Sequence, residues 1–254
     1  GYQESFLDLP GRPAKPRSEG ITHVIDTGLT LAQVEGLLEG AGDYVDIVKL
    51  GWGSAYVTGN LEQKVSLYRS LGADVVLGGT FWEICHGQGR LDDWRRFVDR
   101  LGLETVEVSD GALDIPHDEK LEAIAHLAAD FRVLSEVGSK DDETIIAPYR
   151  WVEMIMAELE AGSWKVITEA RESGTAGIFR GDGEVRMGLI EEISVKVPVE
   201  KLLFEAPQKA QQVWFIKNFG ANVNLGNIPP ADVISLETLR VGLRADTMGW
   251  SPLP

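Results

Sequence analysis

The sequence predicts an α/β protein, a single-domain (β/α)8 barrel of the TIM type, from two kinds of pattern. Eight short runs rich in Val and Ile have strand character, and amphipathic helical segments separate most of them. The runs lie at 21–27, 44–51, 74–80, 104–109, 131–138, 164–171, 201–206 and 222–228. Eight strands alternating with helices in about 250 residues is typical of a closed barrel.

The helical segments have apolar residues at spacings of three and four, over 31–38, 61–71, 91–101, 118–129, 148–159 and 208–219. Thr30 and Pro116 supply start signals for the first and fourth. A doubly wound open sheet is the alternative fold, but the turn over 26–30 lacks the G-x-G-x-x-G pattern of a dinucleotide site. We expect an N-terminal arm over residues 1–18 and the barrel domain over residues 19–254.

Composition limits the function classes. A net charge of −16 and a pI near 4.7 disfavour nucleic acid as a partner, because such a protein repels a phosphate backbone. No apolar run reaches the roughly 18 residues of a membrane span, and the N-terminus lacks a signal pattern, so we expect a cytoplasmic protein without a membrane partner. Cys85 is the single cysteine, which excludes an internal disulfide and disfavours structural zinc.

Charged and polar side chains gather at the predicted carboxyl ends of the strands, where barrel enzymes carry their chemistry. The set comprises Asp26, Lys49, Glu107, Glu136, Lys140, Glu169, Arg171, Glu205 and Asn224. Some members are expected to form internal ion pairs. A whole ring of buried charges is poorly explained by stability alone, because a buried ion pair gains little over packed apolar groups. The ring therefore predicts a site for a metal and an anionic ligand.

The stretch KVITEARESGTAG, residues 165–177, starts as a strand and ends as a glycine-rich loop. Alternate strand residues share a face, so Glu169 and Arg171 point to the same place. We expect Glu169 to face a metal and Arg171 to bind an anionic group. The turn that includes Ser173 and Gly174 is expected to bring backbone amides to ligand oxygens.

Carboxylates beside lysine and arginine predict a particular class of chemistry. Oxygen ligands favour Mg2+, which binds a few protein carboxylates and completes its coordination with water and substrate. Arginine and loop amides suit phosphate or carboxylate. The ring thus predicts a small phosphorylated carboxylic acid as the substrate, Mg2+ as the cofactor and a lysine that moves a proton.

Several long blocks resemble the phosphosulfolactate synthase family across almost the whole chain after the head. They are LGWG at 50–53, GGT at 78–80, VEVSDG at 106–111, LSEVGSKD at 134–141, ITEARESGTAG at 167–177, LFEAPQKAQQ at 203–212 and the segment 223–247. The resemblance implies a Mg2+-dependent (β/α)8 barrel that adds sulfite to phosphoenolpyruvate, giving (2R)-phospho-3-sulfolactate, in a pathway toward coenzyme M-type sulfonates.

The resemblance also implies roles for individual residues. Lys140, in the block LSEVGSKD, matches the family's general acid and is expected to protonate C2 of the substrate. Lys49 is a second catalytic candidate, with binding of phosphate or sulfite as its other role. For the metal we favour Glu136 and Glu169, with Glu107 or Asp26 as further ligands.

Three substrate-binding candidates and two functional alternatives complete the sequence-based prediction. Asn224 and Arg244 join Arg171 as groups expected to orient the ligand. A paralogue that adds a different nucleophile to phosphoenolpyruvate remains an alternative, as does a non-catalytic, stress-associated barrel like the family's plant relative. The sequence leaves the oligomeric state open, a homo-oligomer included.

Overall fold

The computed structural model describes residues 6–138, 146–171 and 173–249. Its strands are β1 (Thr22–Asp26), β2 (Ile47–Leu50), β3 (Asp74–Leu77), β4 (Thr105–Val108), β5 (Arg132–Val137), β6 (Lys165–Thr168), β7 (Leu202–Glu205) and β8 (Leu225–Ile228). They pair in parallel in the order β3-β2-β1-β8-β7-β6-β5-β4. The end strands β3 and β4 lie against each other, so the sheet forms a nearly closed barrel.

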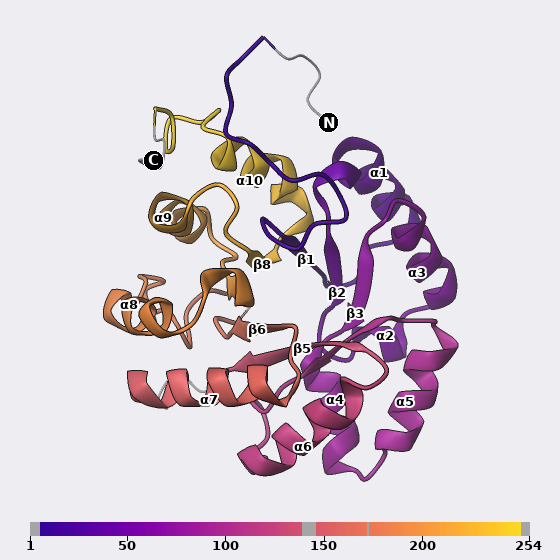
Figure 1. The fold of residues 1–254 in the computed structure, drawn as a ribbon. Helices are drawn as coiled ribbons and strands as arrows, with labels where there is room; N and C mark the ends of the chain where they lie inside the picture. Colours follow the sequence, from indigo (N-terminus) through magenta and orange to yellow (C-terminus); the bar gives the residue numbers. More distant parts are fainter. Residues whose placement is uncertain (1–5, 139–145, 172, 250–254) are drawn as a thin grey trace.

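Helices surround the strands (Figure 1). The α-helices are α1 (Leu31–Ala41), α2 (Ser54–Val57), α3 (Leu61–Ser70), α4 (Gly79–Gly87), α5 (Leu91–Arg100), α6 (His117–Leu127), α7 (Pro148–Ala161), α8 (Met187–Lys196), α9 (Lys209–Phe219) and α10 (Val233–Arg240). Short 3-10 helices are η1 (Gly42–Tyr44), η2 (Val199–Lys201) and η3 (Pro230–Asp232). The predicted barrel is confirmed, and α2, α4, α8 and α10 add to the six helices expected from periodicity.

Local sequence explains where several helices begin. At α1, the Thr30 side chain accepts the backbone N–H of Gln33, and Gln33 in turn accepts the backbone N–H of Thr30. This capping box satisfies two donors that the first turn of a helix leaves unpaired. Helix α7 begins at Pro148, whose missing N–H costs nothing at this position.

The barrel interior is layered. Side chains alternate along each strand, so the residues two positions before Lys49, Glu136, Glu169 and Glu205 also point inward. These lower positions belong to one aliphatic cluster, formed by Ile21, Ile47, Val76, Leu134, Ile167 and Leu203. A separate, larger apolar core lies between the sheet and its helices. The charged groups therefore sit on an aliphatic layer, at the carboxyl end of the barrel.

The N-terminal segment crosses the amino-terminal end of the barrel and is fixed there by buried cations (Figure 1). Arg12 pairs with Glu237 of α10 at 3.1 Å, and Arg17 pairs with Asp46 at 2.9 Å. Lys15 donates to the carbonyls of residues 42, 45 and 71. These bonds tie the segment to backbone oxygens at the ends of helices and strands, where ladder partners run out.

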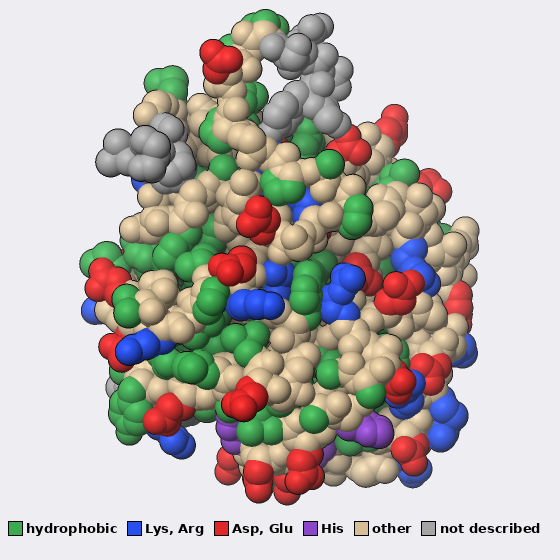
Figure 2. Space-filling model, viewed as in Figure 1, with side chains coloured by type: hydrophobic (Ala, Val, Ile, Leu, Met, Phe, Trp, Pro, Cys, Tyr) green, Lys and Arg blue, Asp and Glu red, His purple; other side chains and the backbone are tan. Residues whose placement is uncertain are grey.

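Surface features agree with the composition. Figure 2 shows acidic and basic side chains interspersed over the face that carries the N-terminal segment. Within residues 6–138, 146–171 and 173–249, none of the helices combines the length and the apolarity needed to cross a bilayer.

Candidate active site

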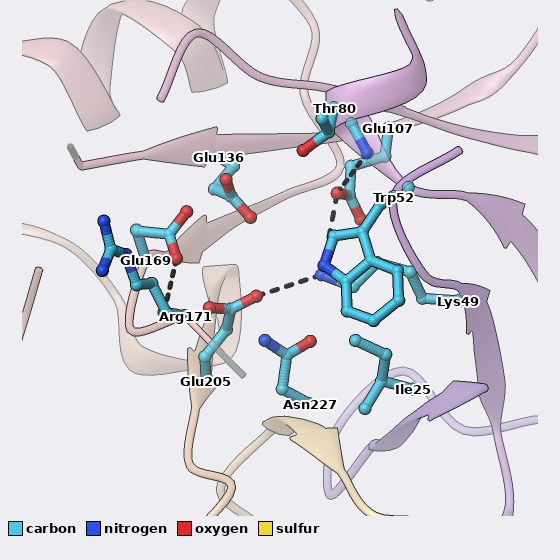
Figure 3. A pocket seen from close by; sticks show the side chains of 12 residues that line it. Ile25, Lys49, Trp52, Thr80, Glu107, Glu136, Glu169, Arg171, Glu205 and Asn227 are labelled. Atoms are coloured by element: carbon cyan, nitrogen blue, oxygen red, sulfur yellow. Dashed lines mark hydrogen bonds and ion pairs between the residues drawn. The ribbon is translucent and has the colours of Figure 1, made fainter. Parts of the chain in front are cut away.

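A cavity of about 300 Å3 opens at the carboxyl ends of the strands, a size at the lower end of small-molecule sites. Its lining comprises Ile25, Lys49, Trp52, Gly78, Gly79, Thr80, Glu107, Glu136, Glu169, Arg171, Glu205 and Asn227. Figure 3 shows the acidic side chains and Lys49 converging on this space from different strands, with the Arg171 guanidinium at its edge beyond Glu169. The expected gathering of acidic and basic groups at one end of the barrel is present.

Three buried glutamates form the acidic part of the cavity. Glu136 ends up beside Glu169 and Glu205, and one carboxylate oxygen of each lies within 4.8 Å of the others. Backbone amides orient two of them: the N–H of Ala170 donates to Glu205 at 2.9 Å, and that of Arg171 donates to Glu169. A set of carboxylate oxygens at this separation fits a hard divalent cation such as Mg2+ or Ca2+.

Lys49 is the cation that compensates this acidic ring. Its Nζ lies 3.0 Å from Oε1 of Glu205 and 3.7 Å from Oε1 of Glu107. Burial disfavours the charged amine, but Glu107, Glu205 and Glu136 outweigh that cost and raise the pKa of Lys49. Lys49 therefore remains protonated at neutral pH, which suits charge stabilisation and anion binding better than proton transfer.

Glu107 occupies a different position from the three clustered glutamates. Its Oε1 accepts the backbone N–H of Gly79 at 2.8 Å, at the start of α4. Burial raises the pKa of Glu107 from 4.5 to about 7, with Glu136 adding to the rise and Lys49 opposing it. Burial also raises the pKa of Glu205. Carboxyl groups with such perturbed pKa values commonly gather at functional clefts.

Arg171 lines the cavity from the loop after β6. Its backbone has a φ of +60°, in the left-handed region that non-glycine residues seldom adopt. Gly177 supports this loop at close range, because a Cβ there would lie 1.9 Å from the carbonyl oxygen of Glu169. The fold thus holds an unusual backbone conformation at the rim of the cavity, and such conformations cluster at ligand-binding sites.

The structure corrects the expected role of Asp26. This side chain points away from the barrel interior, toward α3, where Lys64 and Tyr68 each bond Oδ2 at 2.9 Å. Its Oδ1 accepts the N–H groups of residues 28 and 29. Because Ile25 faces inward, the next residue must face outward. Asp26 joins β1 to α3 and is not placed to bind a metal in the cavity.

Asn224 is also corrected, because it lies at the opposite end of the barrel. It precedes the first residue of β8, and its Oδ1 accepts the N–H of Ile21 at 3.0 Å while its Nδ2 donates to the carbonyl of Leu202. The predicted strand over 222–228 starts before β8 does, so it wrongly includes Asn224 among the strand residues. Asn227 lines the cavity instead.

Other substrate-binding candidates also lie outside the cavity lining. The Ser173 hydroxyl forms a hydrogen bond with the Thr175 hydroxyl at 2.7 Å. The carbonyl of Gly174 accepts a hydrogen bond from Nε2 of Gln211 at 2.8 Å, so this turn packs on α9. Arg244 follows α10, where it donates to Ser235. Lys140 falls in residues 139–145, outside the described residues, and its role stays a prediction.

Comparisons with known proteins agree with an eight-stranded barrel that carries a charged cavity, the architecture of a barrel enzyme. A sequence model of the (2R)-phospho-3-sulfolactate synthase family matches residues 10–246. Phosphosulfolactate synthase from Bacillus subtilis is 44% identical over 244 residues, covering 95% of this chain and 97% of that protein. The enzyme of the same name from Methanothermobacter thermautotrophicus is 42% identical over 247 residues, covering 94% and 95%.

A solved structure supports the fold alone. The 3-keto-L-gulonate-6-phosphate decarboxylase of Vibrio cholerae superposes with a TM-score of 0.52 at 12% identity, covering 87% of this chain and 95% of that one. The family match and the identities above 40% over nearly the full length are decisive for classification. The chain belongs to the phosphosulfolactate synthase family and is an enzyme of that family.

Proposed function

We propose that the protein catalyses the Mg2+-dependent addition of sulfite to phosphoenolpyruvate, giving (2R)-2-O-phospho-3-sulfolactate, in the cytoplasm. The observation that carries the proposal is one cavity lined by three clustered glutamates together with Lys49 and Arg171. Family membership supplies the reaction class. The acidic cluster and the cations supply opposite charges for a metal and for anionic substrates.

The bond changes define what the site must do. The sulfur lone pair of sulfite forms a bond to C3 of phosphoenolpyruvate, the C2–C3 π electrons move toward C2 and the carboxylate, and C2 then takes a proton. A divalent cation held by Glu136, Glu169 and Glu205 would stabilise the negative charge that develops on the substrate carboxylate.

The cationic residues have three separate roles: charge compensation, anion binding and proton donation. Lys49, fixed by Glu205 and Glu107, offsets anionic charge inside the cavity without releasing its proton. Arg171 binds a phosphate or sulfonate group through its planar guanidinium. Lys140 donates the proton to C2, as the family resemblance implies.

The test is to incubate the purified protein with phosphoenolpyruvate, sulfite and Mg2+ and to follow the loss of the enol phosphate and the new phosphorus signal by NMR. Glu169→Gln should lose turnover, because it removes a charge from the cluster at constant shape. Exposed Glu153, which pairs with Arg150 on α7, gives the matched control Glu153→Gln, which should retain turnover. Consumption of phosphoenolpyruvate only with another nucleophile would identify a paralogous reaction, and no turnover with any nucleophile would refute the proposal.

Ligand binding separates a catalytic role of Lys140 from a binding role. Phosphoenolpyruvate with Mg2+ should raise the melting temperature, because a ligand at a hundredfold excess over Kd stabilises the folded state by about 2.7 kcal/mol. Lys140→Ala should abolish turnover and leave most of this stabilisation. Loss of both would show that Lys140 binds the substrate.

A further inference from the structure

Strand β8 contains an irregularity beside the cavity. Its pairing with β1 runs from Thr22 opposite Leu225 to Val24 opposite Ile228, so β8 has one residue more than β1 over the same distance. Asn227 lies in this bulge with a φ of +53°. Asn is among the few residues that tolerate this left-handed conformation, and bulges beside active sites redirect side chains. The bulge therefore turns Asn227 into the cavity.

Gly226 makes the bulge compatible with a packed barrel. A Cβ at this position would lie 2.3 Å from Cδ2 of Leu203 and 3.1 Å from Nδ1 of His23. Leu203 belongs to the aliphatic layer and is fully buried, so it has little freedom to move. The Gly226-Asn227 pair is thus suited to this one backbone path.

His23 holds the bulge from inside the barrel. It is fully buried on β1, and its Nδ1 accepts the backbone N–H of Asn227 at 3.2 Å. Burial, with a further contribution from the charge on Lys49, lowers the pKa of His23 well below its ordinary value. The ring is therefore neutral, as it must be for Nδ1 to accept a hydrogen bond.

The side chain of Asn227 has an acceptor that needs a donor. The residue is 3% exposed, and its Oδ1 has no hydrogen-bond partner among the described residues. Leaving a buried polar atom unpaired is costly. In Figure 3 the amide lies near Glu205 and Ile25, with the Lys49 amine and the Trp52 ring beside them. Lys49 directs its amine to Glu205 and Glu107 at 3.0 and 3.7 Å, and among the described residues neither Lys49 nor Trp52 bonds Oδ1 of Asn227. Fully ionised phosphoenolpyruvate and sulfite are acceptors too, whereas water carried by a divalent cation is a donor.

We propose that Asn227 accepts a hydrogen bond from water on the bound cation, and that His23 is the positioning residue that fixes the β8 bulge. The inference rests on the proposed function, because it needs a cation at the clustered glutamates. It adds a neutral residue to the outer shell of the metal, where partners of this kind commonly change metal affinity by about tenfold or more.

Two substitutions of Asn227 test the side chain without straining the backbone, because Gly and Asp both tolerate a positive φ. Asn227→Gly removes the acceptor and should weaken Mn2+ binding, measured by electron paramagnetic resonance, by about tenfold. Asn227→Asp keeps an acceptor and should bind Mn2+ at least as tightly as the parent protein. Urea unfolding of each variant checks that the fold is retained.

A matched pair tests His23. The side-chain oxygen of Asn occupies the position of Nδ1 in His, so His23→Asn should keep the bond to the N–H of Asn227, and His23→Leu should lose it. We expect Mn2+ affinity to fall about tenfold in His23→Leu and to recover in His23→Asn. A role in packing alone would predict the reverse order, because Leu fills the apolar site better.

The outcomes distinguish this inference from the function on which it rests. If the parent protein binds no Mn2+, the proposed metal site fails and the inference fails with it. If the parent binds Mn2+ and Asn227→Gly binds it equally well, the inference alone is overturned. The same holds if Asn227→Asp weakens Mn2+ binding as much as Asn227→Gly, since the amide would then act as a donor.

Discussion

Replacing Lys49 with methionine should destabilise the folded protein, and the loss should depend on pH. Methionine has a similar length without the charge, so Lys49→Met leaves the two carboxylates at 3.0 and 3.7 Å without their lysine. At an effective dielectric constant near 20, each contact contributes about 5 kcal/mol of gross attraction. The dehydration of three buried charges offsets much of this. Removing one partner of a buried pair still costs about 3–5 kcal/mol.

The sign of the pH dependence follows from the carboxyl pKa values. Glu107 has a folded-state pKa of about 7 against an ordinary 4.5, and loss of the lysine raises it further. A carboxyl with a raised folded-state pKa gives its full stability below its unfolded pKa and loses it as the pH rises through its folded pKa. The deficit of Lys49→Met should therefore be larger at about pH 8 than at about pH 5.

Urea unfolding followed by tryptophan fluorescence at the two pH values measures this deficit. Lys209→Met is the control, because Lys209 is half exposed and pairs with Asp246 at the surface at 3.0 Å. Its loss should cost less than about 1 kcal/mol at either pH. If Lys49→Met unfolds within about 1 kcal/mol of the parent protein at both pH values, the ion pairs are not the groups that hold the cavity together.

Three further substitutions should change the free energy of unfolding in a direction that follows from the structure. The parent protein should lose unfolding free energy as Glu107 ionises between about pH 5 and about pH 8, and Glu107→Gln should not, because glutamine cannot ionise. The stability of Glu107→Gln relative to the parent should therefore rise by on the order of 3 kcal/mol over this range. A pH-independent difference in urea unfolding would contradict this. Gly79→Ala should lose about 1–3 kcal/mol in the same assay, since its Cβ would lie 2.4 Å from Oγ of Ser109, and unchanged stability would mean that α4 shifts freely. Arg12→Met should lose about 3 kcal/mol in urea unfolding by leaving Glu237 buried without its arginine; an unchanged midpoint would show that the N-terminal segment is dispensable.

The fold was predictable because its periodicities are strong. Runs of Val and Ile indicate eight strands, and apolar spacings of three and four indicate six of the helices. Helix α4 was not predicted, because its residues, 79–87, follow β3 directly and mix glycine with aromatic residues. Helix α8 was not predicted, because it follows a long loop after β6 and the apolar spacing of the helix does not stand out from that segment.

The site was predictable where a strand is regular. Period-two alternation correctly placed Lys49, Glu107 and Glu136 in the cavity. The same alternation with an inexact strand boundary misplaced Asn224, and a bulge that no periodicity reveals concealed Asn227. Glu205 was part of the predicted ring, but sequence spacing alone did not rank it above the other carboxylates as a metal ligand.

The aliphatic layer beneath the charged groups has a consequence for proton traffic. Hydrocarbon side chains such as Ile47, Leu134 and Ile167 cannot relay protons, so the floor of the cavity is sealed against exchange with the solvent below. A proton delivered to a bound molecule must enter from the rim, where the loops after the strands meet water. The direction of its arrival is thereby restricted to the side of the cavity that opens to solvent.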